Sequence, residues 1–218
     1  MSFAIGPPEK ILVTLQLALL LRDGFAGSDD LLGDVAVSCG AIEGQRKNSS
    51  GVFLFFNLKP GALLFEISCA SSTPYYLATQ IPINVPMPSA VWPAFPDRTI
   101  ADPTLPLGDP GQTAAYKAQL QQATLLPSVA YPFPGGSTLI RGTVTHGGQP
   151  LSAATVQQVG GTGTAYTTGA DGQFVLFITN PPTLPQQVTV SATHAGLADG
   201  NASVTVLRGL TVSTTIAM

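Results

Sequence analysis

Apolar and polar residues alternate along much of this chain in the short runs that are typical of β-strands. The clearest run covers residues 139–145, where Arg141 and Thr143 alternate with Ile140 and Val144. Other β-prone runs, separated by turns rich in Gly, Pro, Asn and Asp, lie at residues 11–21, 31–37, 52–56, 62–69, 75–85, 151–159, 166–168, 174–178, 188–192, 201–207 and 210–217. This pattern predicts an all-β protein built from antiparallel sheets.

Two glycine-containing turns are the strongest local signals. Gly147-Gly148 follows the first strand of the second half, and Asp171-Gly172 lies between the runs 166–168 and 174–178. Asp-Gly between two β-prone runs favours a tight hairpin, because both central positions of such a turn take a positive φ. The sequence therefore predicts that these two runs pair with each other.

The most apolar run, Ile11–Leu21, raises the question of a membrane segment. It has about half of the roughly 20 apolar residues that a spanning helix needs, and Arg22-Asp23 follow directly. Pro7-Pro8 and Glu9-Lys10 precede it, whereas a signal peptide begins with a basic segment and ends at a small-residue cleavage site. We interpret the run as a core strand. We expect no membrane span and cytoplasmic synthesis without a signal peptide, with release as part of a particle as a further possibility.

The placement of turns and prolines divides the chain into four parts. Residues 1–10 form an extended arm, residues 11–85 a first β-sandwich, residues 86–137 a connector rich in Pro and aromatic residues, and residues 138–218 a second β-sandwich. One short helix is predicted in the connector over Gln112–Gln122, with Asp109 as its N-cap and Pro110 at its first position.

The connector is unlike a flexible linker, since it is rich in aromatic residues. Two interpretations stay open: it packs across its own two domains, or it is a surface that binds a partner. The arm is similarly expected to order against a neighbour. Under the second interpretation the candidate partner contacts are the apolar and aromatic residues Phe3, Ile5, Trp92, Phe95, Tyr116, Tyr131 and Phe133.

Charge is scarce and unevenly distributed. Charged residues make up 10% of the chain, the net charge is −3 and the mean hydropathy is +0.30. The only charged residues among residues 138–218 are Arg141, Asp171, Asp199 and Arg208. This composition gives no electrostatic basis for nucleic-acid binding. It fits either a surface covered by other subunits or a soluble Thr-rich β surface.

The residues that commonly carry catalysis are few. His146 and His194 both fall in Gly-rich loops without a Cys, Asp or Glu at metal-ligand spacing, and no zinc, serine-hydrolase or phosphate-loop motif is present. We therefore predict no catalytic residue, no bound metal and no cofactor. Cys39 and Cys69 are expected to be buried thiols, with a disulfide between them as the less favoured alternative.

The second half also matches a family pattern. Arg141-Gly142-Thr143-Val144, Gly148-Gln149-Pro150-Leu151, and Ala170-Asp171-Gly172-Gln173-Phe174 resemble the carboxypeptidase regulatory-like domain. That resemblance implies a transthyretin-like β-sandwich. The first half resembles the same module more weakly, with Gly33-Asp34-Val35 in place of the G-x-V element and Ser50-Gly51-Val52-Phe53 in place of D-G-x-F.

This family resemblance implies an accessory role. Such modules without a signal peptide look similar to accessory pieces of phage-tail-like contractile injection systems, such as cap, adaptor or decoration proteins. We expect a non-enzymatic structural subunit whose partners are other protein subunits in a homo- or hetero-oligomer, joined by addition of a strand to an open sheet edge. The alternative is a carbohydrate- or surface-binding module that uses Trp92 and tyrosines for stacking.

Overall fold

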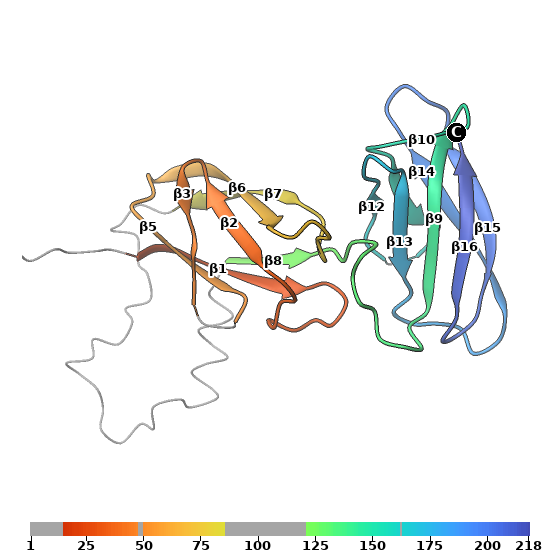
Figure 1. Cartoon of the computed structure of the whole chain (residues 1–218), viewed down its shortest axis with the longest axis horizontal. Coiled ribbons are helices and arrows are strands. Elements are labelled where there is room, and N and C mark those ends of the chain that lie inside the picture. Colours follow the sequence, from red (N-terminus) through yellow and green to blue (C-terminus); the bar gives the residue numbers. More distant parts are fainter. Residues whose placement is uncertain (1–14, 48–49, 86–120, 162) are drawn as a thin grey trace, which may run out of the picture.

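The computed structural model describes residues 15–47, 50–85, 121–161 and 163–218, and every helix or strand element in these ranges is a β-strand (Figure 1). The strands form four four-stranded sheets. The all-β prediction is confirmed for this part of the chain. The predicted arm with Phe3 and Ile5, and the connector residues Trp92, Phe95 and Tyr116, lie outside the described residues.

The first half has eight strands: β1 (Leu15–Asp23), β2 (Val35–Cys39), β3 (Ile42–Glu43), β4 (Gln45–Arg46), β5 (Val52–Phe56), β6 (Gly61–Cys69), β7 (Thr79–Val85) and β8 (Gln121–Leu125). One sheet has the order β4-β5-β1-β8 and the other β3-β2-β6-β7. The central strand β1 pairs antiparallel with β5 and parallel with β8. A parallel pair requires a long connection, and strands β2 to β7 all lie between β1 and β8 in the sequence.

The second half has the remaining strands: β9 (Leu139–His146), β10 (Gln149–Pro150), β11 (Thr155–Gln158), β12 (Tyr166–Thr167), β13 (Gln173–Phe177), β14 (Gln186–Thr193), β15 (Gly200–Val206) and β16 (Thr211–Ala217). In one sheet β9 pairs antiparallel with β10 and β13 and parallel with β16. The other sheet has the order β12-β11-β14-β15.

The two halves share one pairing scheme. The trio β5-β1-β8 corresponds to β13-β9-β16, and the trio β2-β6-β7 corresponds to β11-β14-β15. A backbone contact repeats as well: the Leu21 N–H donates to the Gly51 carbonyl at 2.8 Å, and the Val144 N–H donates to the Gly172 carbonyl at 2.9 Å. Gly51 and Gly172 therefore hold equivalent places against the first strand of their halves.

Each half has its own hydrophobic core between its two sheets, which gives a sandwich-like architecture. In the first core Phe55 of β5 meets Phe65 of β6 edge to face, with ring centroids 5.0 Å apart. In the second core Ile140, Val190 and Ile216 are fully buried. The alternation of buried and exposed residues along the strands thus follows from one face packing on a core.

Several strand positions follow the sequence pattern closely. Strand β5 covers the predicted residues 52–56, and the Gly147-Gly148 turn joins β9 to β10 with both glycines at positive φ. The strand predicted over residues 31–37 begins only at Val35, because Gly33 takes a left-handed φ of 68° that interrupts extended backbone.

The hairpin predicted at Asp171-Gly172 is wrong. Gly172 does turn with a φ of 67°, but β12 pairs with β11 while β13 pairs with β9, so the turn leads from one sheet to the other. The Thr168 backbone and hydroxyl bond the backbone of Leu151, Ala153 and Ala154, and these bonds tie the segment before the turn to the opposite sheet. Long-range pairing has overridden a local hairpin signal.

Two further expectations need correction. The connector predicted over residues 86–137 extends too far, because Gln121–Leu125 form β8 and complete a sheet of the first half. The last two residues of the predicted helix belong to this strand. The rest of that helix lies outside the described residues. In addition, Gly33 precedes β2 and so is not the equivalent of Gly142, which lies in β9.

Candidate functional site at the junction of the two cores

A buried carboxylate marks the end of the first strand. Asp23 closes β1 and is 1% exposed. Its Oδ1 accepts the backbone N–H groups of Phe25 at 2.7 Å and Ala26 at 2.8 Å, and its Oδ2 accepts the hydroxyls of Tyr76 and Tyr131, both at 2.7 Å. Four donors satisfy the carboxylate, which is what a charge away from water requires.

The two tyrosines come from distant parts of the chain. Tyr76 lies in the loop between β6 and β7, and its hydroxyl also accepts the Leu32 N–H at 3.1 Å. Tyr131 lies in the segment that follows β8. Burial, together with donation to Asp23, raises the pKa of both phenols above the usual range. The Asp23 cluster therefore joins three segments that are far apart in sequence.

Aromatic rings extend this cluster to the second half. Phe25 contacts Tyr131, Phe133 and Phe177, with ring centroids 5.8, 5.1 and 5.5 Å apart. Phe177 is the last residue of β13, so it brings a strand of the second half against the loop that follows β1. Such edge-on and tilted ring pairs contribute about 0.5–1.5 kcal/mol each beyond the area they bury.

The second half also holds the backbone of the segment between the halves. Arg141 of β9 donates from Nη1 to the Val129 carbonyl at 2.8 Å, and its guanidinium lies over the Phe133 ring at 5.6 Å. Tyr166 of β12 is buried, and this burial raises the pKa of its phenol to about 12. The second half thus bonds the segment between the halves at the Val129 carbonyl.

The same segment is bonded to the first half. The Leu77 N–H donates to the Leu126 carbonyl at 2.9 Å, and the Ser128 N–H donates to the Tyr75 carbonyl at 2.8 Å. The Ser128 hydroxyl donates to the Pro74 carbonyl. We call residues 126–133 the junction segment, because both halves hold it by specific hydrogen bonds.

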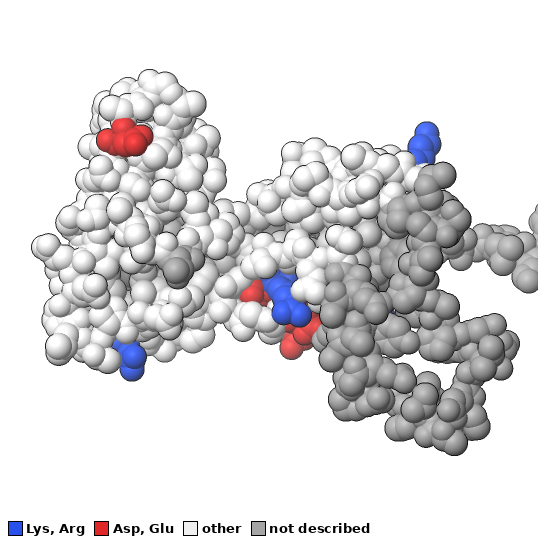
Figure 2. All heavy atoms as spheres, turned by 180° about the vertical axis from the view of Figure 1, so that it is seen from behind, with Lys and Arg blue, Asp and Glu red and all other residues white. Residues whose placement is uncertain are grey.

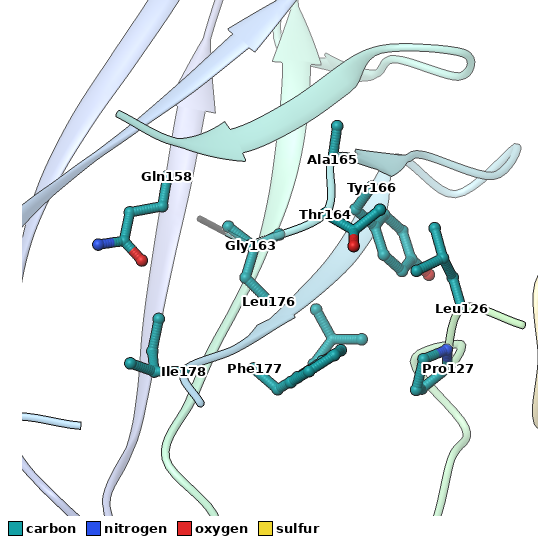
Figure 3. Close-up of a pocket in the computed structure, with 11 residues that line it drawn as sticks. Leu126, Pro127, Gln158, Gly163, Thr164, Ala165, Tyr166, Leu176, Phe177 and Ile178 are labelled. Atoms are coloured by element: carbon teal, nitrogen blue, oxygen red, sulfur yellow. The ribbon is translucent and has the colours of Figure 1, made fainter. Parts of the chain in front are cut away.

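Little space remains at the seam between this segment and β13. Figure 3 shows Leu126 and Pro127 beside Tyr166 and Phe177. The cavity there is partly open and has a volume of about 20 Å³, which is room for one or two water molecules rather than a substrate. The junction is therefore a packed contact between halves and not a ligand pocket.

The structure places two of the predicted partner contacts inside this junction. Tyr131 is 6% exposed with its hydroxyl on Asp23, and Phe133 packs against Phe25 and Arg141. These two side chains pack between the two halves of the chain. This agrees with the interpretation that the connector packs across its own two domains. In the same segment Pro127 and Ser128 are buried as well, whereas Pro132 and Pro134 are exposed.

Cys39 and Cys69 are free thiols, as the favoured expectation had it, and the alternative of a disulfide between them is wrong. Strands β2 and β6 pair Val35 with Cys69 and Ser38 with Glu66, so Cys39 lies four residues along the ladder from Cys69. Four strand residues span about 13 Å, whereas a disulfide needs Cα atoms within about 7 Å. Both side chains are partly buried, and burial raises the pKa of Cys39.

The two histidines lie apart from the junction. His146 closes β9 with Nδ1 2.8 Å from the Met218 carbonyl, and the His194 Nδ1 is 2.9 Å from the Ala195 carbonyl. Within the described ranges, no three His, Cys, Asp or Glu side chains gather in a way that would hold a metal ion. No helix in those ranges is long and apolar enough to cross a membrane.

Sequence reasoning did not single out Asp23, Phe25, Tyr76, Tyr166 or Phe177. One signal was present: Asp23 follows the most apolar run of the chain, which the sequence pattern predicted to be a core strand. A carboxylate at such a position is either solvated or bonded within the fold, and only the placement of Tyr76 and Tyr131 decides between these outcomes.

Comparison with known proteins gives little beyond this geometry. No family model matches the chain, and no curated protein matches it. One solved structure, titled "The Bacillus anthracis TIE protein", aligns with 94% of this chain at 9% identity and a TM-score of 0.29. The aligned region is 34% of that protein's chain. A similarity at this level supports no argument about fold or function.

Proposed function

We propose that this chain is a non-enzymatic structural subunit of a larger protein assembly, made of two transthyretin-like β-sandwich modules held at a fixed spacing. The junction carries this proposal: a buried Asp23 cluster, a set of aromatic rings and a hydrogen bond from Arg141 to Val129 join the two halves through specific contacts. Close packing at such a junction fixes the two halves relative to each other, so that subunits bound to either half are held at a defined distance.

The repeated pairing scheme supports the two-module part of the proposal. The equivalent strands, and the equivalent glycines Gly51 and Gly172, are what duplication of one module would leave. Divergence of the first copy accounts for its weaker family pattern.

The surface of the second half supports an assembly role. Residues 138–218 contain two cationic and two anionic residues, and in the view of Figure 2 this half is almost entirely uncharged. An isolated soluble domain usually carries a larger share of charged surface, since charge keeps proteins from associating. A subunit whose surface is covered by neighbouring subunits does not need this charged surface. A cap, adaptor or decoration protein of a phage-tail-like particle is the specific form that we propose.

The deciding experiment is gentle isolation of the protein from its source, followed by native mass measurement, electron microscopy and identification of co-purifying chains. We expect rings, filaments or tail-like particles with defined neighbours. A monomer without any co-purifying chain would overturn the proposal.

One feature favours the alternative, a carbohydrate- or surface-binding module. An open groove crosses the outer face of β13, β9 and β16, and polar side chains line most of it, among them Arg141, Thr143, Gln173, Ser213 and Thr215. Hydroxyl, amide and guanidinium groups are suited to bonding sugar hydroxyls. A glycan screen with the Thr143→Ala and Gln173→Ala variants tests this reading, which predicts binding that both substitutions weaken.

A further inference from the structure

One sheet edge of the second half is long, uncharged and unpaired within the described chain. Strand β16 bonds β9 on one side and no described strand on the other. It is seven residues long, with the sequence TVSTTIA, and contains neither charge nor proline. In Figure 1 it lies beside β15 on the side of the second half that faces away from the first half.

The other described edges have the features by which proteins prevent edge-to-edge pairing. Strand β7 contains Pro82, and β3, β4, β10 and β12 have two residues each. Strand β8 has five residues and ends two residues before Pro127. Strand β13 faces the seam that Leu126 and Pro127 close (Figure 3). Strands β15 and β16, edge strands of the two different sheets of the second half, are the exceptions.

The register of β16 shows which of its backbone groups are available. The Leu139 N–H donates to the Leu210 carbonyl, and the Met218 N–H donates to the Thr145 carbonyl. In a parallel ladder alternate residues bond the same neighbour, so the N–H and carbonyl groups of residues 212, 214 and 216 point toward β9. The N–H and carbonyl groups of Thr211, Ser213 and Thr215 therefore point away from β9, toward the open edge. The Ala217 carbonyl also points away from β9 but lies against Gly200 of β15.

We infer that β16 pairs antiparallel with the β16 strand of a second copy of this chain, about a two-fold axis at Thr214. This inference rests on the proposed assembly function, and it identifies one contact between subunits of that assembly. The available residues lie symmetrically about Thr214, so Ser213 faces Thr215 of the second copy and Thr211 faces its Ala217. The two Ser213–Thr215 pairs form about four backbone hydrogen bonds, and the Ala217 N–H of each copy adds one to the Thr211 carbonyl of the other.

The side chains argue for a second copy as the occupant. Two-fold pairing sets every residue of β16 against one from the same short stretch, and this stretch holds no charge that would meet its like. The exposed residues of the adjacent strand β15, Asn201, Ser203 and Thr205, are also small and uncharged. The result is a continuous sheet in the order β13-β9-β16-β16-β9-β13, an isologous interface.

The test introduces like charges across this axis. The double variant S213K/T215K places two lysines opposite two lysines, and S213E/T215E does the same with carboxylates. Each variant alone should raise the dimer dissociation constant, measured by sedimentation equilibrium, about 100-fold or more. An equimolar mixture of the two should restore dimers, because opposite charges then face each other.

The control variant is Q173K/Q187K, which adds the same charge at exposed positions of β13 and β14. It should leave the dissociation constant unchanged, and circular dichroism should show native β content for all variants. Restored dimers in the mixture would also exclude misfolding as the cause of the loss.

Two results would overturn the inference: a wild-type chain that is monomeric at all concentrations, or a wild-type dimer that both edge variants leave intact. Neither result contradicts the proposed function if the natural protein still co-purifies with other chains in a particle. Absence of any assembly in the source would overturn the function itself.

Discussion

At the scale of single residues, Asp23 contributes most to the junction. Its two oxygens accept four hydrogen bonds from residues up to 108 positions away in sequence. Asp23→Asn keeps the shape but removes the charge and turns an acceptor into a donor that faces two hydroxyls. We expect it to lower the free energy of unfolding by about 3 kcal/mol in urea denaturation. Asp199→Asn, at an exposed position, should change it by less than about 0.5 kcal/mol.

The buried phenols predict an alkaline limit to stability. Burial raises the pKa of Tyr166 to about 12 and raises those of Tyr76 and Tyr131 above the usual value of about 10. The neutral form is favoured in the folded state, so the stabilisation is complete below pH 10 and is lost as the pH rises from about 10 to 12. Absorbance of tyrosinate at alkaline pH should rise together with loss of the β signal in circular dichroism. Ionisation of all phenols in a protein that stays folded would contradict this.

At the scale of elements, Gly172 decides how the chain passes between the sheets of the second half. A Cβ there would lie 2.6 Å from the Val144 carbonyl oxygen, and its φ is 67°. Gly172→Ala should therefore cost about 3 kcal/mol, the sum of left-handed strain and a backbone clash. The matched control is Gly148→Ala, with a φ of 79° and nothing within 4 Å, which should cost only about 1 kcal/mol. Equal losses in thermal unfolding would show that the close approach does not matter.

At the scale of the whole molecule, the junction should couple the two cores. Arg141 and Phe177 of the second half bond and pack against Val129 and Phe25, so unfolding one half removes contacts from the other. We expect a single calorimetric transition for the wild type and two separated transitions for Arg141→Ala/Phe177→Ala. Gln173→Ala, exposed on β13, should keep the single transition. Two transitions in the wild type would show that the halves are independent.

Local chemistry determined much of this fold. Alternation and turn residues were sufficient to place β5 and β9, and the positive-φ glycines Gly147, Gly148 and Gly172 lie where the turn signals put them. Strand existence and turn position depend on residues within a few positions of one another, and such information is readable from sequence alone.

Tertiary structure decided which elements meet. Asp171-Gly172 turns as its residues require, yet it joins two sheets instead of two paired strands, because β9 and β11 already supply the partners. In the same way Asp23 became a buried acceptor only because Tyr76 and Tyr131 arrive from loops that no local pattern connects. Hydrogen bonds across 53 and 108 residues depend on the whole packing of the chain, and this is why the junction emerged from the structure and not from the sequence.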